Sequence, residues 1–283
     1  MNTQLKDKTV EYLNYLIQIG ETEMTLHAET WQALQKMEVP KSSFIKMEHA
    51  VEKASFATTA ASPIKLSTYA PNLSISEKAK ALQELAEALR SCPICAKLFQ
   101  HKKKTIFGLG EPDADIVFVG EAIGLEEDEL GEPFVGKAGQ MLTKMITAMG
   151  LSRDQVYLTT LVKFRPDMPA GSKQDRKPTV EEIKASLPFL ASQLNILKPK
   201  VIVCLGTTVL EALLNIDKAT VAGLRGNFLD YGGVPLMPTF HPGYLLTHSS
   251  NEDKRAAWED LLKVMKKVGL PISEKQQQFF LKK

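Results

Sequence analysis

The sequence predicts an α/β fold: a three-layer αβα sandwich around a central, mainly parallel four-stranded sheet, with an N-terminal helical extension. Two observations lead to this prediction. Short β-rich runs alternate with segments of helical periodicity from about residue 76 onward, which is typical of βαβ units and of a sheet covered on both faces. Before that point the pattern is different and indicates separate, purely helical material.

The N-terminal part is predicted to form a helical hairpin. Residues 3–19 and 22–37 place apolar side chains at mostly helical spacings, so we expect a helical extension over residues 1–39. From Pro40 to about Leu73 the pattern dissolves into Ser, Thr, Ala and Pro, which indicates a linker over residues 40–75. The main domain is expected at 76–270, and residues 271–283 are expected to form a frayed or helical C-terminal tail.

The main domain is predicted to begin with an amphipathic helix that Ser76-Glu-Lys caps and that runs to Cys92. Strands are expected at Ile116–Gly120, Val156–Val162, Val201–Leu205 and Val234–Phe240. Helices are expected near residues 137–149, 179–197, 207–215 and 252–268. A hairpin around Gly232-Gly233 would lead into the last strand from an antiparallel neighbour.

Composition and charge are those of an ordinary globular protein. The chain has 283 residues, 44% of them hydrophobic and 24% charged, and its net charge of +2 permits nucleic-acid binding without arguing for it. No apolar run approaches the roughly 20 residues that cross a bilayer, and the first residues lack a signal peptide. We therefore expect no membrane association and a cytoplasmic location, which three cysteines without a disulfide framework also fit.

Ligands of open α/β sheets bind at the carboxyl ends of the strands, so the loops after the four predicted strands are expected to share one rim. The first loop, from Gly120 to Gly139, is rich in glycine and acidic residues and runs into a helix whose free N–H groups suit an anion. It is neither a Walker A nor a G-x-G-x-x-G sequence, which disfavours a nucleotide cofactor. Taken alone, this loop and His241 after the last strand fit a structural role as well as a functional one.

The combination of motifs is more specific. The chain contains Gly-Glu-Ala-x-Gly-x-x-x-Asp-x-x-Gly-x-Pro-Phe-Val-Gly-x-Ala-Gly, then Val-Tyr-Leu-Thr, Lys-x-Arg-Pro, Pro-Lys-Val-Ile-Val-x-Leu-Gly and Leu-Arg-Gly. It ends with His-Pro-Gly-Tyr-Leu-Leu and Lys-Arg-x-x-Trp-Glu-Asp-Leu. In this order, over about Ser91 to Leu270, the motifs resemble the uracil-DNA glycosylase superfamily, and within it the thermophile-type family 4, whose members usually carry an iron–sulfur cluster.

The resemblance implies base flipping and hydrolysis of the N-glycosidic bond of uracil, or of another deaminated base, in DNA. His241 would donate a hydrogen bond to uracil O2, and Glu121 would position the attacking water. Phe134 would stack on the base. The base-binding residues implied are Gly120, Ala122, Phe134 and Thr160.

The resemblance also implies DNA contacts at three places. Lys137 and the helix start at Gly206 and Thr207 would meet phosphates. The apolar run Tyr244, Leu245 and Leu246 would be exposed and would wedge into the duplex.

The chain departs from the family at two of the four cluster cysteines. Cys92 and Cys95 match the first pair, but Phe164 and Ser186 stand where the other two cysteines belong, so we expect no iron–sulfur cluster. A zinc site of Cys92, Cys95 and His101 would lack a fourth ligand. We therefore expect no metal and no cofactor.

Other departures concern the base pocket and the DNA contacts. Thr160 stands where the family has an Asn that reads the uracil edge, and a hydroxyl cannot make the paired contacts of an amide, which costs on the order of 1–3 kcal/mol. Ile123 replaces a Pro, and Thr247 stands where an Arg commonly follows.

Three hypotheses remain open at this point. The leading one is a DNA-repair glycosylase, weak or shifted in base preference, whose partner is DNA containing uracil or another deaminated base. The second is a catalytically weak or inactive DNA-binding protein of the same fold that contacts a protein partner through residues 1–39. The third, a small-molecule enzyme, rests on fold analogy alone.

Overall fold

The computed structural model describes residues 73–100, 104–169, 172, 174–216, 218–247 and 249–281. All of them belong to one compact unit that spans residues 63–283. The predicted N-terminal helical hairpin, most of the predicted linker, and His101 lie outside the described residues.

A six-stranded mixed sheet forms the centre of the unit, with strand order β1-β3-β2-β4-β6-β5. Its four inner strands run parallel, and they are β3 (Tyr157–Thr160), β2 (Ile116–Gly120), β4 (Val201–Leu205) and β6 (Val234–Thr239). These are the four predicted strands, at nearly the predicted bounds.

The sheet has two short edge strands besides the four predicted ones: β5 is the antiparallel neighbour that the predicted hairpin implied, whereas β1 was not foreseen. The strands β1 (Leu109–Gly110) and β5 (Leu229–Tyr231) pair antiparallel with β3 and β6. Strands of two and three residues are too short to show a periodic pattern. The hairpin predicted between β5 and β6 is confirmed, and both of its turn glycines, Gly232 and Gly233, adopt positive φ.

Helices α4 to α13 connect and follow the strands. The long ones are α4 (Ile75–Arg90), α7 (Lys137–Ala148), α8 (Val180–Leu197) and α12 (Asn251–Val268). The shorter ones are α5 (Pro93–Leu98), α6 (Leu125–Leu130), α9 (Thr207–Leu214), α10 (Val221–Leu224), α11 (Pro242–Thr247) and α13 (Glu274–Gln277). Helix α4 starts two residues earlier than predicted, because its N-cap is Ser74, which forms a capping box with Glu77.

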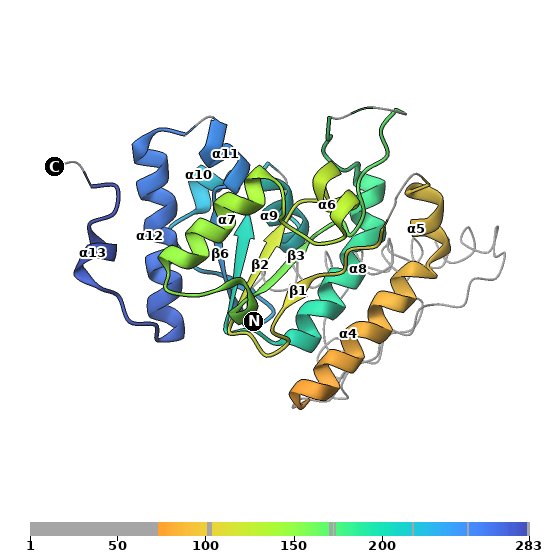
Figure 1. The fold of residues 1–283 in the computed structure, drawn as a ribbon, viewed down its shortest axis with the longest axis horizontal. Coiled ribbons are helices and arrows are strands. Elements are labelled where there is room, and N and C mark those ends of the chain that lie inside the picture. Colours follow the sequence, from red (N-terminus) through yellow and green to blue (C-terminus); the bar gives the residue numbers. More distant parts are fainter. Residues whose placement is uncertain are drawn as a thin grey trace, which may run out of the picture. The chain divides into compact units, whose positions relative to one another are not determined.

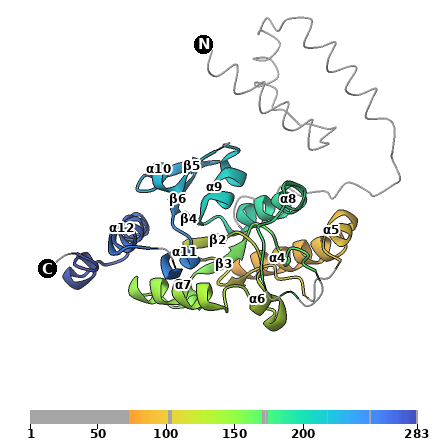
Figure 2. The same ribbon diagram turned by 90° about the horizontal axis from the view of Figure 1, so that it is seen from above.

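The helices cover both faces of the sheet, which confirms the three-layer αβα sandwich (Figures 1 and 2). Successive side chains of a strand point to opposite faces. Val117 and Val119 of β2 pack in the core that α4, α5, α8 and α9 cover, whereas Ile116 and Phe118 pack in the core beneath α7 and α12. All five residues of β2 are therefore buried, and so are those of β4.

The C-terminal segment, expected to be frayed or helical, is helical at α13 and is bound to the body of the unit. The indole Nε1–H of Trp258 donates to the carbonyl of Gln276, and the side-chain amide of Gln276 donates to the carbonyl of Ala148. The guanidinium of Arg255 donates to the carbonyls of Gln277 and Phe279. None of the helices in the described ranges has the length and apolar character needed to cross a bilayer.

Candidate active site

The carboxyl ends of the four parallel strands lie at one edge of the sheet, toward which the strand arrows point in Figure 1 and beside which α11 lies. The loops expected to share a rim therefore do share it. Backbone hydrogen bonds fasten two of them together, because the N–H groups of Leu161 and Val162 donate to the carbonyls of Gly120 and Glu121. Gly206 likewise donates to the carbonyl of Thr239 at the end of β6.

Phe134 is held in a backbone conformation that bulky residues rarely adopt, with φ of 57°. Arg153 stabilises it, since its guanidinium donates to the carbonyls of Phe134 and Pro133 at 2.9 and 2.8 Å. Sequence reasoning missed Arg153, because it acts on backbone atoms and stands in no motif. The phenyl ring is 7% exposed.

Two glycines of the first loop make room for Phe134. A Cβ atom on Gly120 would lie 2.5 Å from the Phe134 ring, and one on Gly139 would lie 1.9 Å from the Phe134 backbone. Any larger residue at either position would displace the ring. The structure thus explains why the loop needs glycine at both positions and brings Phe134 against Gly120, as the base-binding prediction requires.

Glu127 closes the same loop and is a second residue that sequence reasoning missed. Its Oε1 accepts the N–H groups of Val135 and Gly136 at 3.1 and 3.0 Å, just before α7 begins. Its charge also acts on His241, where it opposes the lowering of the imidazole pKa. The motif of this loop leaves position 127 unspecified, so the sequence carried no signal for Glu127.

His241 is half-buried, and its partial removal from water lowers the pKa of its imidazole below the usual 6.5. Its Nδ1 accepts the backbone N–H of Gly243 at 3.1 Å. In the neutral ring the proton must therefore lie on Nε2, which makes this nitrogen a hydrogen-bond donor. A Cβ atom on Gly206 would touch the Cβ of His241 at 3.4 Å, so the third and fourth loops meet at this side chain.

Glu121 stands at the end of β2, and its carboxylate is largely buried. Burial raises its pKa above the usual value, and Lys177 and a hydrogen bond with Thr208 act in the opposite direction. Its Oε1 is buried and accepts no hydrogen bond from the described residues. Because buried polar atoms are nearly always paired, this oxygen is available to a ligand or a water molecule.

Thr160 is at the end of β3, beside Gly120 across the β2–β3 ladder, and is 3% exposed. Its hydroxyl donates to the carbonyl of Val162 at 2.9 Å. With its only proton used, the Thr160 oxygen can offer a base only lone pairs. Ala122 is partly buried and packs against the core that α8 covers, and Ile123 is buried.

Three helices at this edge of the sheet, α6, α7 and α9, have a glycine as N-cap and therefore no N-cap side chain; the glycines are Gly124, Gly136 and Gly206. At α6 the carboxylate of Asp175 accepts the N–H of Leu125 at 3.3 Å, whereas the starts of α7 and α9 have no side-chain acceptor among the described residues. Uncapped N–H groups at a helix start suit an anion. The predicted phosphate contacts Lys137 and Thr207 are the first residues of α7 and α9, so the structure places them at such sites.

The predicted wedge residues separate into exposed and buried ones. Tyr244 and Leu246 are 38% and 47% exposed, in line with the prediction. Leu245 is only 3% exposed, so its predicted exposure is wrong. The residues form helix α11, which turns Leu245 inward to the core beneath α7 and α12. Thr247 ends this helix with its hydroxyl bonded to the carbonyl of Gly243.

The place of the family's cluster is part of the apolar core. Cys92 and Cys95 are buried and form no disulfide, and the Phe164 ring packs on Phe99 with 4.7 Å between centroids. Ser186 is buried and its hydroxyl finds no partner among the described residues. Two thiols, a phenyl ring and an unpaired hydroxyl do not fit a cluster that needs four thiolates. Across the described ranges, no three His, Cys, Asp or Glu side chains lie together as a metal site.

Comparison with known proteins agrees with this geometry. The family model of the uracil DNA glycosylase superfamily matches residues 107–262. A type-4 uracil-DNA glycosylase from Thermotoga maritima is 40% identical over 183 residues, which cover 64% of this chain and 92% of the relative. A type-4 uracil-DNA glycosylase from Archaeoglobus fulgidus is 34% identical over 208 residues, covering 70% of this chain and 98% of the relative.

Proposed function

The chain belongs to the uracil DNA glycosylase superfamily, and from this premise we propose that it is a DNA-repair hydrolase that removes uracil, or another deaminated base, from DNA. The observation that carries the proposal is that the two strand-end residues His241 and Glu121 offer complementary groups: an imidazole whose Nδ1 is occupied and a buried carboxylate oxygen that has no partner among the described residues. The hypothesis of a protein that only binds DNA leaves both groups without a use.

The flipped base would lie on Phe134 and against Gly120. A ring fixed by an unusual backbone conformation needs little reorganisation when a base stacks on it. The Thr160 oxygen can accept a hydrogen bond from the ring N–H of uracil. Hypoxanthine and xanthine carry the same kind of N–H, so this contact supports deaminated bases as a class.

His241 would stabilise the leaving group. As the bond between C1′ and N1 breaks, the electron pair of this bond passes to the uracil ring, and negative charge develops on O2. The Nε2–H of neutral His241 is suited to donate to that oxygen, and a donor partly withdrawn from water is worth more than one in water. Desolvation disfavours the charged imidazolium, so the neutral ring with its Nε2–H is the favoured donor.

Glu121 would serve the other half of the reaction. Its unpartnered Oε1 can accept a proton of a water molecule that attacks C1′, and its negative charge favours the developing sugar cation. The carboxylate must be ionised for both tasks, and the neighbouring Lys177 favours that form. Products are the free base and an abasic site in DNA.

DNA would lie across the edge of the sheet on which the carboxyl ends of the strands lie. The starts of α7 and α9, with Lys137, Gly206 and Thr207, suit two phosphates. Tyr244 and Leu246 are the exposed apolar groups next to His241 and would fill the gap that the flipped nucleotide leaves. Leu245 would support them from the core.

We further propose that the protein works without an iron–sulfur cluster. In the relatives' place for the cluster, the stacked rings of Phe99 and Phe164 supply apolar packing that stabilises the same region. No step of the reaction above needs a metal. A cytoplasmic location and a protein partner for residues 1–39 belong to the same proposal.

The test is a panel of oligonucleotides that contain uracil, hypoxanthine or xanthine, incubated with the protein in excess and then cleaved at abasic sites with alkali. We expect strand scission at uracil in the wild-type protein and its loss in His241→Ala. No scission at any of the three bases would reject the proposal. Equal DNA binding by both proteins with no scission by either would instead support the binding protein.

A further inference from the structure

A cavity of about 310 Å³ lies between α7, α12 and the C-terminal segment, and neither Glu121 nor His241 is among the residues that line it. Its walls are almost wholly apolar and are formed by Met141, Met145, Ala148, Leu245, Trp258 and Phe279, among others. We call it the α7–α12 groove. Its volume is at the small end of the range of ligand sites, about 300–1,000 Å³, and it suits an aromatic or branched side chain.

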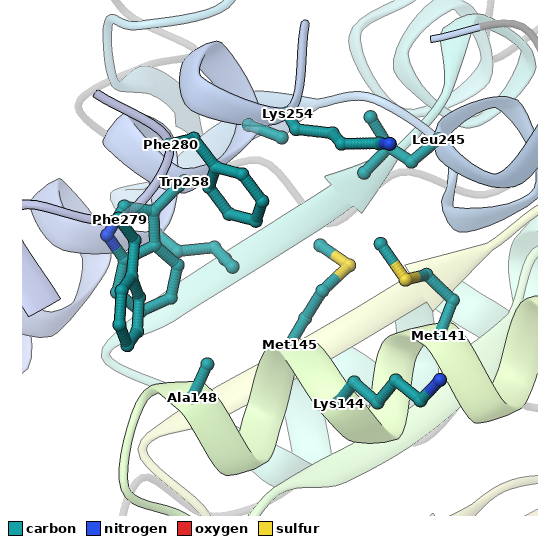
Figure 3. A pocket seen from close by; sticks show the side chains of 11 residues that line it. Met141, Lys144, Met145, Ala148, Leu245, Lys254, Trp258, Phe279 and Phe280 are labelled. Carbon is teal, nitrogen blue, oxygen red and sulfur yellow. The ribbon is translucent and has the colours of Figure 1, made fainter. Parts of the chain in front are cut away.

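The two ends of the groove differ in character: one is aromatic and the other is basic (Figure 3). Trp258, Phe279 and Phe280 lie at one end, whereas the ammonium groups of Lys144 and Lys254 reach toward the other end, where Leu245 and Met141 lie. No Asp or Glu lines the groove. Within the described part of the chain neither ammonium group makes an ion pair, so both are available to an anionic ligand.

The C-terminal segment forms one wall of the groove, and hydrogen bonds hold this segment in place. Four side-chain hydrogen bonds, described above, fasten residues 276–279 to α7 and α12, and the Phe279 ring contacts Trp258 with 5.3 Å between centroids. Phe280 at the aromatic end of the groove and the next residue, Leu281, are 47% and 46% exposed. An apolar surface of this kind next to a cavity is typical of a site for another molecule.

We propose that the α7–α12 groove docks a segment of a partner protein that presents an aromatic or aliphatic side chain beside Asp or Glu carboxylates. The apolar side chain enters the cavity at its aromatic end, and the carboxylates pair with Lys144 and Lys254. DNA is a poorer occupant, because a phosphate backbone would leave the apolar cavity unfilled. Since Leu245 lines the groove and belongs to α11, the partner would sit beside the DNA-binding edge without covering His241.

The test uses the full chain and calorimetric titration with an unlabelled ten-residue peptide that carries one Phe among four Asp. We expect saturable binding, at least tenfold weaker when Ser replaces the Phe or when Lys replaces the Asp residues. The double variant Lys144→Glu with Lys254→Glu should bind the acidic peptide at least tenfold more weakly. The matched control, Lys266→Glu with Lys275→Glu, changes exposed residues outside the groove by the same charge and should bind as the wild type does.

A second variant tests the cavity itself without a change of charge. Ala148→Phe should fill the aromatic end and weaken binding of the Phe peptide, while thermal unfolding checks that the variant is folded. Peptides that bind equally well with and without Phe, or not at all, overturn the proposal. It is also overturned if the lysine variant weakens binding to a short single-stranded oligonucleotide instead, or if sedimentation shows a dimer that Ala148→Phe dissociates. None of these measurements depends on glycosylase activity.

Discussion

The backbone N–H of Gly243 donates to Nδ1 of His241, with 3.1 Å between the two nitrogen atoms. Because Nδ1 accepts this hydrogen bond, the proton of the neutral imidazole lies on Nε2. Desolvation lowers the imidazole pKa and so favours the ring that carries a single proton. A single backbone group, two residues further along the chain, thus sets both the tautomer and the direction of the catalytic hydrogen bond.

From this relationship we expect that His241→Ala lowers the single-turnover rate of uracil excision about 100- to 1,000-fold, the usual effect of removing one donor to a developing anion. Binding of the same oligonucleotide should change little, because the donor acts mainly on the transition state. His241→Asn, which keeps a donor, should recover part of the rate. Thr247→Ala, in the last turn of α11, is the matched control and should retain activity.

The pH dependence of excision should reflect Glu121. Burial raises its pKa above 4.5, so the active carboxylate is lost as the pH falls through this raised value. Desolvation lowers the pKa of His241 below 6.5, so this ring also gains a proton only toward lower pH, and the Glu121→Gln variant distinguishes the two groups. We expect an acid limb in the single-turnover rate that Glu121→Gln removes, together with a loss in rate of about 100-fold or more. An unchanged acid limb in this variant would contradict the assignment.

The same shift has an opposite consequence for stability. A carboxyl group whose pKa is raised by folding stabilises the folded state at pH values below its unfolded pKa, and this contribution is lost as the pH rises through its folded pKa. At neutral pH the ionised, largely buried carboxylate of Glu121 therefore lowers the free energy of unfolding. Urea unfolding at pH 7 should show Glu121→Gln to be more stable than the wild type, with the difference vanishing at a pH below 4.

Base selection should respond to Thr160. Since its hydroxyl proton is bonded to the carbonyl of Val162, the side chain offers uracil O4 no donor. Thr160→Asn supplies an amide donor and acceptor, and we expect it to raise the excision rate for uracil about 5- to 150-fold, the equivalent of 1–3 kcal/mol. Thr160→Val, which removes the hydroxyl and keeps the shape, should lower it. Parallel assays with uracil and hypoxanthine oligonucleotides would show whether the gain is specific for uracil.

The parts of the fold that the sequence predicted are those with a repeating pattern. The strands β2 and β4 are continuous apolar runs, and the long helices α7, α8 and α12 repeat apolar residues along one face, so both kinds of element were located to within a few residues. Edge strands of two or three residues carry no such signal. The inward turn of Leu245 also depends on the packing of α11 against its neighbours, which no local pattern encodes.

Among the residues of the site, those that stand in motifs were predicted and those that only support them were not. Motifs located all three residues: Glu121 and His241 closely follow β2 and β6, and Phe134 lies in the Pro-Phe-Val-Gly motif of the first loop. The residues that hold them in place were missed, since Arg153 and Glu127 act on backbone carbonyl and N–H groups, contacts that any polar side chain of suitable reach can make. The positive φ of Phe134 likewise follows from the close approach of Gly120 and Gly139 and from no property of phenylalanine.

The packing of Phe164 leads to a prediction about iron. Protein purified without oxygen should contain no iron, and about four irons per chain would contradict the proposal of a cluster-free enzyme. Because the Phe164 ring is fully buried against Phe99, Phe164→Ala should cost about 3–5 kcal/mol of unfolding free energy. Urea unfolding measures that cost, and a loss below 1 kcal/mol would show that this region does not depend on the aromatic pair.

The last prediction concerns Lys163, which is fully buried and has no carboxylate partner among the described residues. Its amine donates to Thr159 and Gln193, both at 2.5 Å, and burial lowers its pKa well below 10.5. A lysine whose pKa is lowered by folding contributes its full stabilisation only at pH values above its unfolded pKa. As the pH falls below 10.5, the free energy of unfolding decreases by up to about 1.4 kcal/mol for each pH unit. The free energy of unfolding should therefore fall from pH 10 to pH 7, and Lys163→Met should flatten this slope and be at least as stable at pH 7.

The matched control is Lys78→Met: that lysine is also buried but pairs with Asp113 at 2.7 Å, so its loss should destabilise the protein at pH 7. An equally steep slope in Lys163→Met would mean that the Lys163 amine is not held neutral by the fold.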